Sequence, residues 1–336
     1  MKFWHMAAVT LMAAGCSGNS LNNGGPSSGS SGGTGTTVDL PGSTTVSASS
    51  PISHSEKQDA ATGDGYATNM TYDATNDTFT VDNLAFDGGN TYTRDTTVPN
   101  LGPYQVYEAA STYQDSLTGT PINQFLYRAI YARSTNKTAD GKPTTEFAIV
   151  RTGAYVPYGF GGFMYQRNGS VVLPTSGQAN YSGKYAGLRD FDGAAGLEYT
   201  TGDMKIAIDF NDFNDPAGVQ GQISNRKIFD VNGNDITGQV LAALSTKTNV
   251  TQTVLPTAVF TVGPGTLSKA GEITNGITST VPTSSGSERL ETGKYYAVLS
   301  GKNAGEVVGI VVMTSADPRV DGVTVRETGG FILQRN

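Results

Sequence analysis

Apolar and polar residues alternate along most of the chain, and the alternation is clearest at residues 124–133. There the aromatic residues Phe125, Tyr127 and Tyr131 are separated by two and four positions, so all three have the same parity. A period of two points successive side chains to opposite faces of a β-strand, whereas a helix needs a period of about 3.6. In the first half of the chain the pattern predicts strands at residues 69–72, 78–81, 104–109, 124–133 and 146–151.

The second half of the chain shows the same pattern more regularly. It predicts strands at residues 177–187, 195–199, 204–210, 218–224, 258–262, 272–278, 294–300, 306–314 and 323–333. Gly, Asp, Asn and Pro separate these segments at intervals of about 8–12 residues, which is typical of a β-meander or barrel. One short helical turn is expected, at residues 240–244. The pattern therefore predicts an all-β fold.

The N-terminus is typical of an export signal. Lys2 precedes a short apolar run over residues 6–14, which is too short to span a bilayer. Residues 13–16, Ala-Ala-Gly-Cys, resemble the lipobox cut by lipoprotein signal peptidase, and Cys16 is the only cysteine in the chain. We expect a signal peptide at residues 1–15 and lipid attachment at Cys16. An ordinary secretory signal with an incidental cysteine is the alternative.

The segment after Cys16 is rich in Ser, Gly, Asn and Thr, and residues 17–37 carry no charge. Such a segment buries too little apolar surface to offset its ordering entropy. We therefore expect a flexible tether over residues 16–55, with His54 a solvated residue within it. An N-terminal β module should follow at residues 60–165, and a barrel at residues 166–336. By analogy with lipoproteins, Ser17 after the cysteine favours sorting to the bacterial outer membrane.

The charge balance restricts the partners. The whole chain has 22 basic and 29 acidic side chains, and loss of Lys2 with the signal changes the net charge from −7 to −8. An acidic body is a poor ligand for nucleic acid or an anionic lipid surface. We expect no nucleic-acid partner. The expected partners are the membrane, reached through the N-terminal lipid, and an unknown protein or small-molecule ligand outside the cytoplasm.

Three motifs in the second half resemble the barrel of the transferrin-binding-protein-B-like surface lipoproteins. Residues 174–183 follow the pattern P-x-x-G-x-A-x-Y-x-G, and residues 219–225 follow V-x-G-x-I-x-N after an Asp-Phe pair. Residues 301–309 are similar to G-P-N-A-x-E-x-x-G, with Lys302 in place of the Pro. The resemblance implies an eight-stranded antiparallel barrel filled by its own side chains, held on an acylated tether. The N-terminal β module would then correspond to the family's smaller, handle-like module.

Few residues suit catalysis or metal binding. His54 is the only histidine after the signal peptide, and Cys16 is predicted to carry lipid. We therefore expect no enzyme activity, no cofactor and no metal site. Residues 230–235 open like a calcium loop but lack its Gly and final Glu, so an Asx turn is favoured. Three carboxylates at Asp209, Asp212 and Asp215 are interpreted as a solvated turn instead of a glycosidase pair.

An aromatic and glycine-rich stretch over residues 155–165 is the candidate binding site. Its aromatic side chains are Tyr155, Tyr158, Phe160, Phe163 and Tyr165. They form either a recognition surface or the interface at which the N-terminal module packs on the barrel, and the interface is favoured. Tyr158 and Phe160 are two apart and are expected to share one face of a strand.

These features together predict an extracytoplasmic binding lipoprotein at the bacterial outer membrane. Its body would face the periplasm or the exterior and would capture a nutrient or an iron carrier. The alternative is a structural or adhesive envelope lipoprotein with no dedicated solute.

Overall fold

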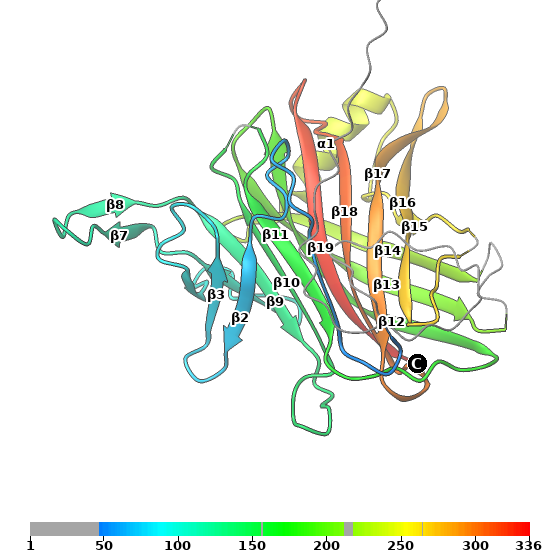
Figure 1. The fold of residues 1–336 in the computed structure, drawn as a ribbon. Helices are drawn as coiled ribbons and strands as arrows, with labels where there is room; N and C mark the ends of the chain where they lie inside the picture. Colours follow the sequence, from blue (N-terminus) through cyan, green and yellow to red (C-terminus); the bar gives the residue numbers. More distant parts are fainter. Residues whose placement is uncertain (1–46, 156, 212–217, 264) are drawn as a thin grey trace, which may run out of the picture. The chain divides into compact units, whose positions relative to one another are not determined.

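Antiparallel strands make up nearly all of the regular structure, as the alternation predicts (Figure 1). The computed structural model describes residues 47–155, 157–211, 218–263 and 265–336, which belong to one compact unit. The predicted signal peptide and Cys16 lie outside the described residues.

Eight strands of the second half form a closed antiparallel barrel. The last strand pairs with the first over a long register that includes Leu188 opposite Thr328. The fold class and the eight-stranded barrel expected from the sequence are thus confirmed. The strands are β12 (Gln178–Asp192), β13 (Leu197–Asp209), β14 (Val219–Asp230), β15 (Ala258–Phe260), β16 (Glu272–Thr283), β17 (Gly286–Ser300), β18 (Glu306–Ala316) and β19 (Thr324–Arg335).

The first half forms a nine-stranded antiparallel sheet in the order β1-β11-β10-β9-β6-β4-β3-β2, with β5 paired to β6. A separate hairpin, β7–β8, projects from this sheet in Figure 1. The strands are β1 (Ile52–Ser55), β2 (Thr68–Asp73), β3 (Thr78–Asp82), β4 (Thr91–Arg94), β5 (Asn100–Leu101), β6 (Tyr104–Glu108), β7 (Thr112–Gln114), β8 (Pro121–Asn123), β9 (Tyr127–Arg133), β10 (Thr145–Thr152) and β11 (Gly161–Arg167).

Side chains on the inner and outer faces of the barrel strands belong to two different hydrophobic cores. Apolar side chains such as Tyr185, Ile277 and Phe331 fill the interior. The outer sides of β12 and β18 pack against the sheet, where Leu188 and Ile310 meet Phe147. Because β18 is covered on both faces, it is apolar at every position from Val307 to Met313, which removes the simple alternation there.

Two adjacent glycines in β19 allow aromatic rings of these two cores to pack closely against the strand. A Cβ on Gly329 would lie 2.2 Å from the ring of Tyr185 inside the barrel. A Cβ on Gly330 would lie 2.4 Å from the ring of Phe147 in the sheet. No real Cβ approaches another heavy atom so closely, so both positions require glycine, one for each face of the strand.

A single α-helix is present among the described residues, and it is longer than expected. The sequence predicts one turn at residues 240–244, but α1 spans Thr237–Thr248 and ends at Asn249 in a left-handed conformation (φ 54°). Its buried residues are Val240, Leu244 and Thr248. Only three residues of the helix are buried, and the last of them is a threonine. The sequence therefore shows little of the apolar period of 3.6 residues that predicts a helix.

One strand was predicted as two. Residues 195–199 and 204–210 belong to the continuous strand β13, because the intervening Thr-Thr-Gly-Asp segment is not a turn. The register between β13 and β14 shifts between Thr201 and Asp203, which marks a β-bulge. A bulge adds a residue to a strand without ending it.

The predicted C-terminal boundary of the tether, residue 55, is also wrong. Residues 52–55 form β1, which pairs with β11 at the edge of the sheet. His54, predicted to be solvated, is only 1% exposed and lies 2.9 Å from Oε1 of Glu272 in the barrel. Its ring also packs against Tyr165 at 5.2 Å between centroids. A Ser-rich composition does not reveal this, because two distant strands bury the segment.

Candidate functional site

The aromatic stretch at residues 155–165 divides between two environments. Phe163 and Tyr165 lie on β11, are nearly fully buried, and belong to the core between sheet and barrel. Phe163 stacks on Tyr296 of the barrel with 6.3 Å between ring centroids. These two residues occupy the interface that the sequence analysis favours for the stretch.

Tyr158 and Phe160 do not share a strand face, contrary to the expectation. The strand β11 begins only at Gly161, so the two residues lie in an irregular segment. Tyr158 lies under the guanidinium of Arg326, 4.5 Å from its ring centre, and burial raises the pKa of the Tyr158 hydroxyl to about 12. Phe160 instead packs edge-on against Tyr66 and Tyr155, each at 4.8 Å.

Tyr155 and Phe160 belong to a continuous series of edge contacts that we call the aromatic row. Beyond Tyr155 the contacts continue to Phe125 at 5.0 Å and from Phe125 to Phe86 at 5.3 Å between centroids. Four of the five rings are half-buried, and Phe86 is 55% exposed. Tilted and edge-to-face rings at these distances stabilise one another. The members of the row are Tyr66, Phe86, Phe125, Tyr155 and Phe160.

The backbone at Phe86 is unusual for a bulky residue. Its φ is +56°, in the left-handed region that costs a non-glycine residue of order 1–3 kcal/mol. The carbonyl of Phe86 accepts a hydrogen bond of 2.7 Å from the backbone N–H of Phe125, which holds the loop against the row. The next residue, Asp87, is buried, and its burial raises the pKa of its carboxyl. A strained loop therefore presents an exposed aromatic side chain.

The β7–β8 hairpin adds exposed apolar side chains close to the row. Tyr113 is 52% exposed, Ile122 39% and Leu117 92%. The carboxylate of Asp115 accepts hydrogen bonds from the backbone N–H groups of Leu117 (3.0 Å) and Thr118 (2.7 Å) and fixes the tip. Five of the ten large hydrophobic residues that are exposed in the described chain lie between residues 86 and 126. The row and hairpin are therefore the main exposed apolar region among the described residues.

Ion pairs across the interface hold the segments that carry the row. Arg326 of β19 donates to the backbone carbonyls of Thr62 and Gly159, each at 2.9 Å, and pairs with Asp190. Gly159 directly precedes Phe160, and Thr62 lies four residues before Tyr66. Buried charge-assisted hydrogen bonds of this kind are short and directional. The barrel thus positions two members of the row.

A second pairing supports the same segment. Arg151 of β10 is fully buried and donates to both carboxylate oxygens of Glu56 (2.8 and 3.0 Å) and to Asp64 (3.1 Å). Burial disfavours the charged guanidinium, but the charges of Glu56 and Asp64 outweigh it and raise the pKa of Arg151. Removing one partner would leave a buried charge unpaired, which is strongly unfavourable.

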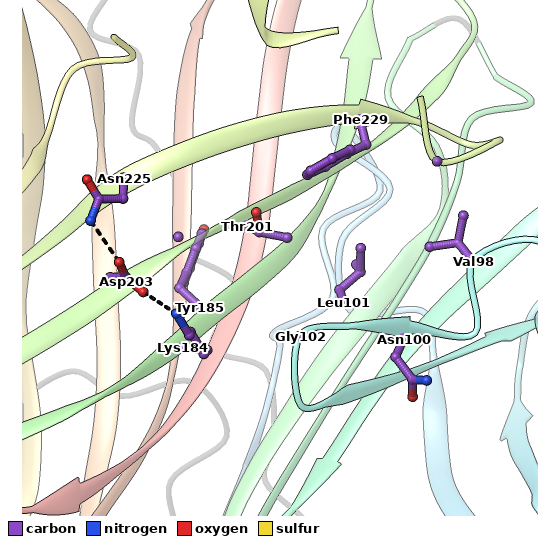
Figure 2. A pocket seen from close by; sticks show the side chains of 12 residues that line it. Val98, Asn100, Leu101, Gly102, Lys184, Tyr185, Thr201, Asp203, Asn225 and Phe229 are labelled. Atoms are coloured by element: carbon purple, nitrogen blue, oxygen red, sulfur yellow. Dashed lines mark hydrogen bonds and ion pairs between the residues drawn. The ribbon is translucent and has the colours of Figure 1, made fainter. Parts of the chain in front are cut away.

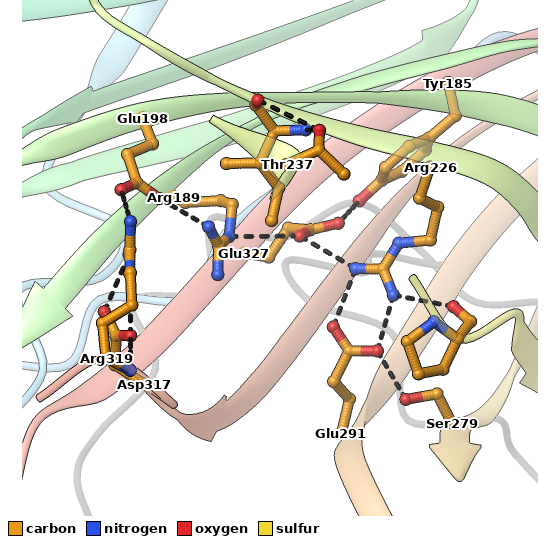
Figure 3. A network of polar contacts seen from close by, with 12 residues as sticks. Tyr185, Arg189, Glu198, Arg226, Thr237, Ser279, Glu291, Asp317, Arg319 and Glu327 are labelled. Atoms are coloured by element: carbon orange, nitrogen blue, oxygen red, sulfur yellow. Dashed lines mark hydrogen bonds and ion pairs between the residues drawn. The ribbon is translucent and has the colours of Figure 1, made fainter. Parts of the chain in front are cut away.

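Buried charges also fill the α1 end of the barrel interior, as Figure 3 shows. Arg226 is bonded to both oxygens of Glu291 (2.6 and 2.7 Å) and to Glu327 (3.0 Å), and the hydroxyl of Tyr185 donates to Glu327 at 2.9 Å. Burial alone would lower the pKa of Arg226, but the two carboxylates outweigh this effect. The pKa of Arg226 therefore lies well above its usual value. This region therefore contains paired side chains of the barrel itself.

A further part of this network continues through Glu198, which accepts from Arg189 (2.5 Å) and Arg319 (2.7 Å). Arg319 also pairs with Asp317 at 2.8 Å. Sequence reasoning missed these residues, because Arg189 and Glu198 stand on separate strands, Asp317 and Arg319 lie in the loop between β18 and β19, and no motif links them.

The acidic segments considered for metal binding are turns where they are described. Asp230 accepts hydrogen bonds from the backbone N–H groups of Asn232 and Asn234, each at 2.9 Å, as in an Asx turn. Asp209 is bonded to Gln178 and Asn211, whereas Asp212 and Asp215 lie outside the described residues. The described residues contain no group of three His, Cys, Asp or Glu side chains arranged to hold a metal ion. Nor does any helix in the described ranges have the length and apolar character needed to cross a bilayer.

No protein-family profile matches the chain, and no curated protein matches its sequence. The chain is similar to solved structures of transferrin-binding protein B. One is a double mutant from Haemophilus parasuis, with 12% identity over 85% of this chain and 44% of that protein, at a TM-score of 0.33. Another is intact Ap-TbpB with its N and C lobes, with 13% identity over 80% of this chain and 46% of that protein, at a TM-score of 0.35.

A third similar structure is the isotype 1 protein from serogroup B Neisseria meningitidis, with 12% identity at a TM-score of 0.30. It covers 68% of this chain and 36% of the meningococcal protein. The chain therefore spans less than half the length of each of these three proteins. The proteins in these structures are named transferrin-binding protein B, which is the family whose barrel motifs residues 174–183, 219–225 and 301–309 resemble.

Proposed function

We propose that this chain is a lipid-anchored binding protein of the bacterial outer membrane, which captures a partner protein through the aromatic row and the β7–β8 hairpin. The observation that carries this proposal is the exposure of Phe86 on a preformed loop and of Leu117 and Ile122 on the β7–β8 hairpin. Monomeric proteins rarely expose a contiguous apolar region without a role in association.

The geometry of the region suits a protein surface better than a small solute. The apolar side chains belong to the aromatic row, with its ring contacts, and to the β7–β8 hairpin. The hairpin projects from the sheet in Figure 1. Aromatic side chains are frequent hot spots in protein interfaces, and loops fixed before binding lose little entropy on association. Asp115 holds the tip that presents Leu117, and the N–H of Phe125 holds the loop that presents Phe86.

The proposed lipid anchor and the proposed role of the captured protein are both inferred from the sequence. The lipobox-like residues before Cys16 and the uncharged segment after it support an acylated tether. We propose that the captured protein carries a nutrient such as iron, as the resemblance of the barrel motifs implies.

A capture experiment tests the proposed surface. A tagged soluble fragment of residues 38–336 is incubated with spent growth medium, beside a variant with Phe86→Ser, Leu117→Ser and Ile122→Ser. We expect a partner to bind the parent fragment and to be lost from the triple variant, with no change in melting temperature. A control variant with Val254→Ser and Val320→Ser alters two exposed valines of the barrel half (72% and 50% exposed) and should retain the partner.

Capture that persists in the triple variant would exclude this surface as the binding site. Expression under iron limitation tests the role of the partner separately. Induction when iron is scarce supports nutrient capture, whereas constant expression together with binding of an envelope or matrix component supports the adhesive role.

A further inference from the structure

A crevice of about 410 Å³ lies where the loop between β4 and β6 meets the outer face of β12, β13 and β14 (Figure 2). Its volume falls within the range of about 300–1,000 Å³ that is typical of small-ligand sites. It lies apart from the aromatic row and shares no residue with it. Its lining includes Val98, Leu101, Lys184, Asp203, Asn225 and Phe229.

One side of the crevice is apolar and preformed. Val98 and Leu101 are nearly buried, and the ring of Phe229 is half-buried beside them. The carboxylate of Asp95 fixes the loop by accepting the backbone N–H of Val98 at 2.9 Å, and it also pairs with Arg128 at 2.9 Å. The apolar side therefore exists before any ligand binds.

The other side presents three polar groups from three neighbouring strands. Asp203 of β13 accepts a hydrogen bond of 2.7 Å from Nζ of Lys184 on β12 and one of 2.8 Å from the amide of Asn225 on β14 (Figure 2). The amide of Asn225 and the ammonium of Lys184 hold the pKa of Asp203 below its usual value. Together the three groups carry no net charge.

The backbone supports the position of Asn225. Its φ is +51°, a left-handed conformation that Asn and Gly tolerate best, at the bulge between β13 and β14. The bulge turns its side chain toward Asp203. An irregularity that costs local stability therefore places an amide at the rim of the crevice.

We propose that this crevice binds a neutral sugar ring. A pyranose has a C–H face that packs on an aromatic ring and hydroxyl groups that both donate and accept hydrogen bonds. Phe229 and Leu101 provide the apolar contact. Asn225 and Lys184 retain N–H groups beyond those given to Asp203, and the Asp203 carboxylate retains lone pairs. A charged ligand would have to compete with the Lys184–Asp203 pair, so the site favours an uncharged one.

Saturation-transfer NMR on the 38–336 fragment tests the site with lactose, maltose and cellobiose, and with glucuronic acid as the charged comparison. We expect transfer to at least one neutral sugar and none to glucuronic acid. Asn225→Gly removes the amide while keeping the left-handed backbone, and Phe229→Leu removes the ring while keeping an apolar side chain. Each should weaken binding at least tenfold.

Lys205→Ala is the matched control, because Lys205 is exposed on the same outer face of β13 two residues from Asp203. It should bind the sugar as the parent does. Lactose coupled to albumin distinguishes a sugar on a glycoprotein from a free one, and binding of either form supports the site. The inference is overturned if no neutral sugar binds the parent, if glucuronic acid binds as well as the neutral sugars, or if the folded Asn225→Gly variant binds as tightly as the parent.

Discussion

Nε2 of His54 lies 2.9 Å from Oε1 of Glu272, although the two residues are 218 positions apart in the chain. His54 is on the edge strand β1 of the sheet, and Glu272 begins β16 of the barrel. Both side chains are buried, with exposures of 1% and 4%. This contact joins the first strand of the described residues to the barrel.

The His54–Glu272 contact should contribute measurably to stability. Replacing either partner removes this buried hydrogen bond, which costs about 1–3 kcal/mol. We expect His54→Ala and Glu272→Ala each to lower the free energy of unfolding by this amount in urea titrations. The double variant should lose less than the sum of the two. Strictly additive losses would show that the side chains do not interact.

The two environments of the aromatic stretch predict different costs of truncation. Phe163→Ala should reduce the free energy of unfolding by about 3–5 kcal/mol, because Phe163 is buried between sheet and barrel. Tyr155→Ala, in the aromatic row, should cost much less, since Tyr155 is only half-buried. Thermal unfolding of the two variants compares them directly. Equal losses would mean that the row, too, belongs to the structural core.

The barrel network predicts a pH dependence. Burial raises the pKa of Glu291, but Arg226 offsets this and leaves it below the usual 4.5. On acidification the unfolded chain therefore binds the proton first, so the contribution of Glu291 is present above 4.5 and is lost as pH falls through the folded pKa. Glu291→Gln should cost about 3–5 kcal/mol at neutral pH, because it breaks a buried pair.

The difference between wild type and Glu291→Gln should then shrink as the pH falls below 4.5, since the wild-type carboxyl becomes protonated too. Urea unfolding at neutral and acidic pH measures this difference. A constant difference across the acidic range would contradict the proposed charge on Glu291.

Arg167 should hold residues 47–50 in place. It is fully buried, and its guanidinium donates only to backbone carbonyls among the bonds that the structure shows. Arg167→Lys should not restore these bonds, because an ammonium cannot reproduce the planar five-donor fork. We expect faster protease cleavage before Ile52 in this variant, detected by mass spectrometry. The carbonyls belong to Ser47, Ser50, Gly169, Ala270 and Leu299.

The proposed anchor depends on one residue outside the described part of the chain. Cys16→Ser removes the thiol that receives the lipid, so the protein should leave the membrane fraction or remain unprocessed. Metabolic labelling with an alkyne fatty acid measures the attachment. Labelling of Cys16→Ser at the wild-type level would refute the lipoprotein assignment.

The motif at residues 301–309 illustrates which features the sequence predicted and which it did not. A strand was predicted at residues 306–314, and β18 occupies this place directly after the short helix η1 (Lys302–Ala304). The motif gave no indication of what Glu306 does. Its carboxylate accepts hydrogen bonds from Ser134 (2.5 Å), Thr144 (2.8 Å) and Thr145 (2.5 Å), which lie 161–172 positions earlier in the loop and strand of the sheet.

Local pattern was sufficient for most of the barrel strands and for many of the turns, because alternation and Asx turns depend on neighbouring residues only. Asp73, for example, accepts the backbone N–H of Thr75 at 2.8 Å in the turn predicted after residues 69–72. In the first half of the chain the local pattern missed β1, β4, β5, β7, β8 and β11. The eight-stranded barrel was implied by the resemblance of three short motifs to a known family, since the local pattern alone left a β-meander open. These features were determined by the sequence itself.

Only the tertiary structure decided which aromatic side chains are buried and which are exposed. Tyr155 and Phe163 stand in the same stretch, yet the barrel covers Phe163 and leaves Tyr155 in the row. The burial of His54 and the meeting of Phe229 with Leu101 in the crevice have the same origin. Burial depends on which distant strand packs over a residue, and two-residue periodicity carries no information about that partner.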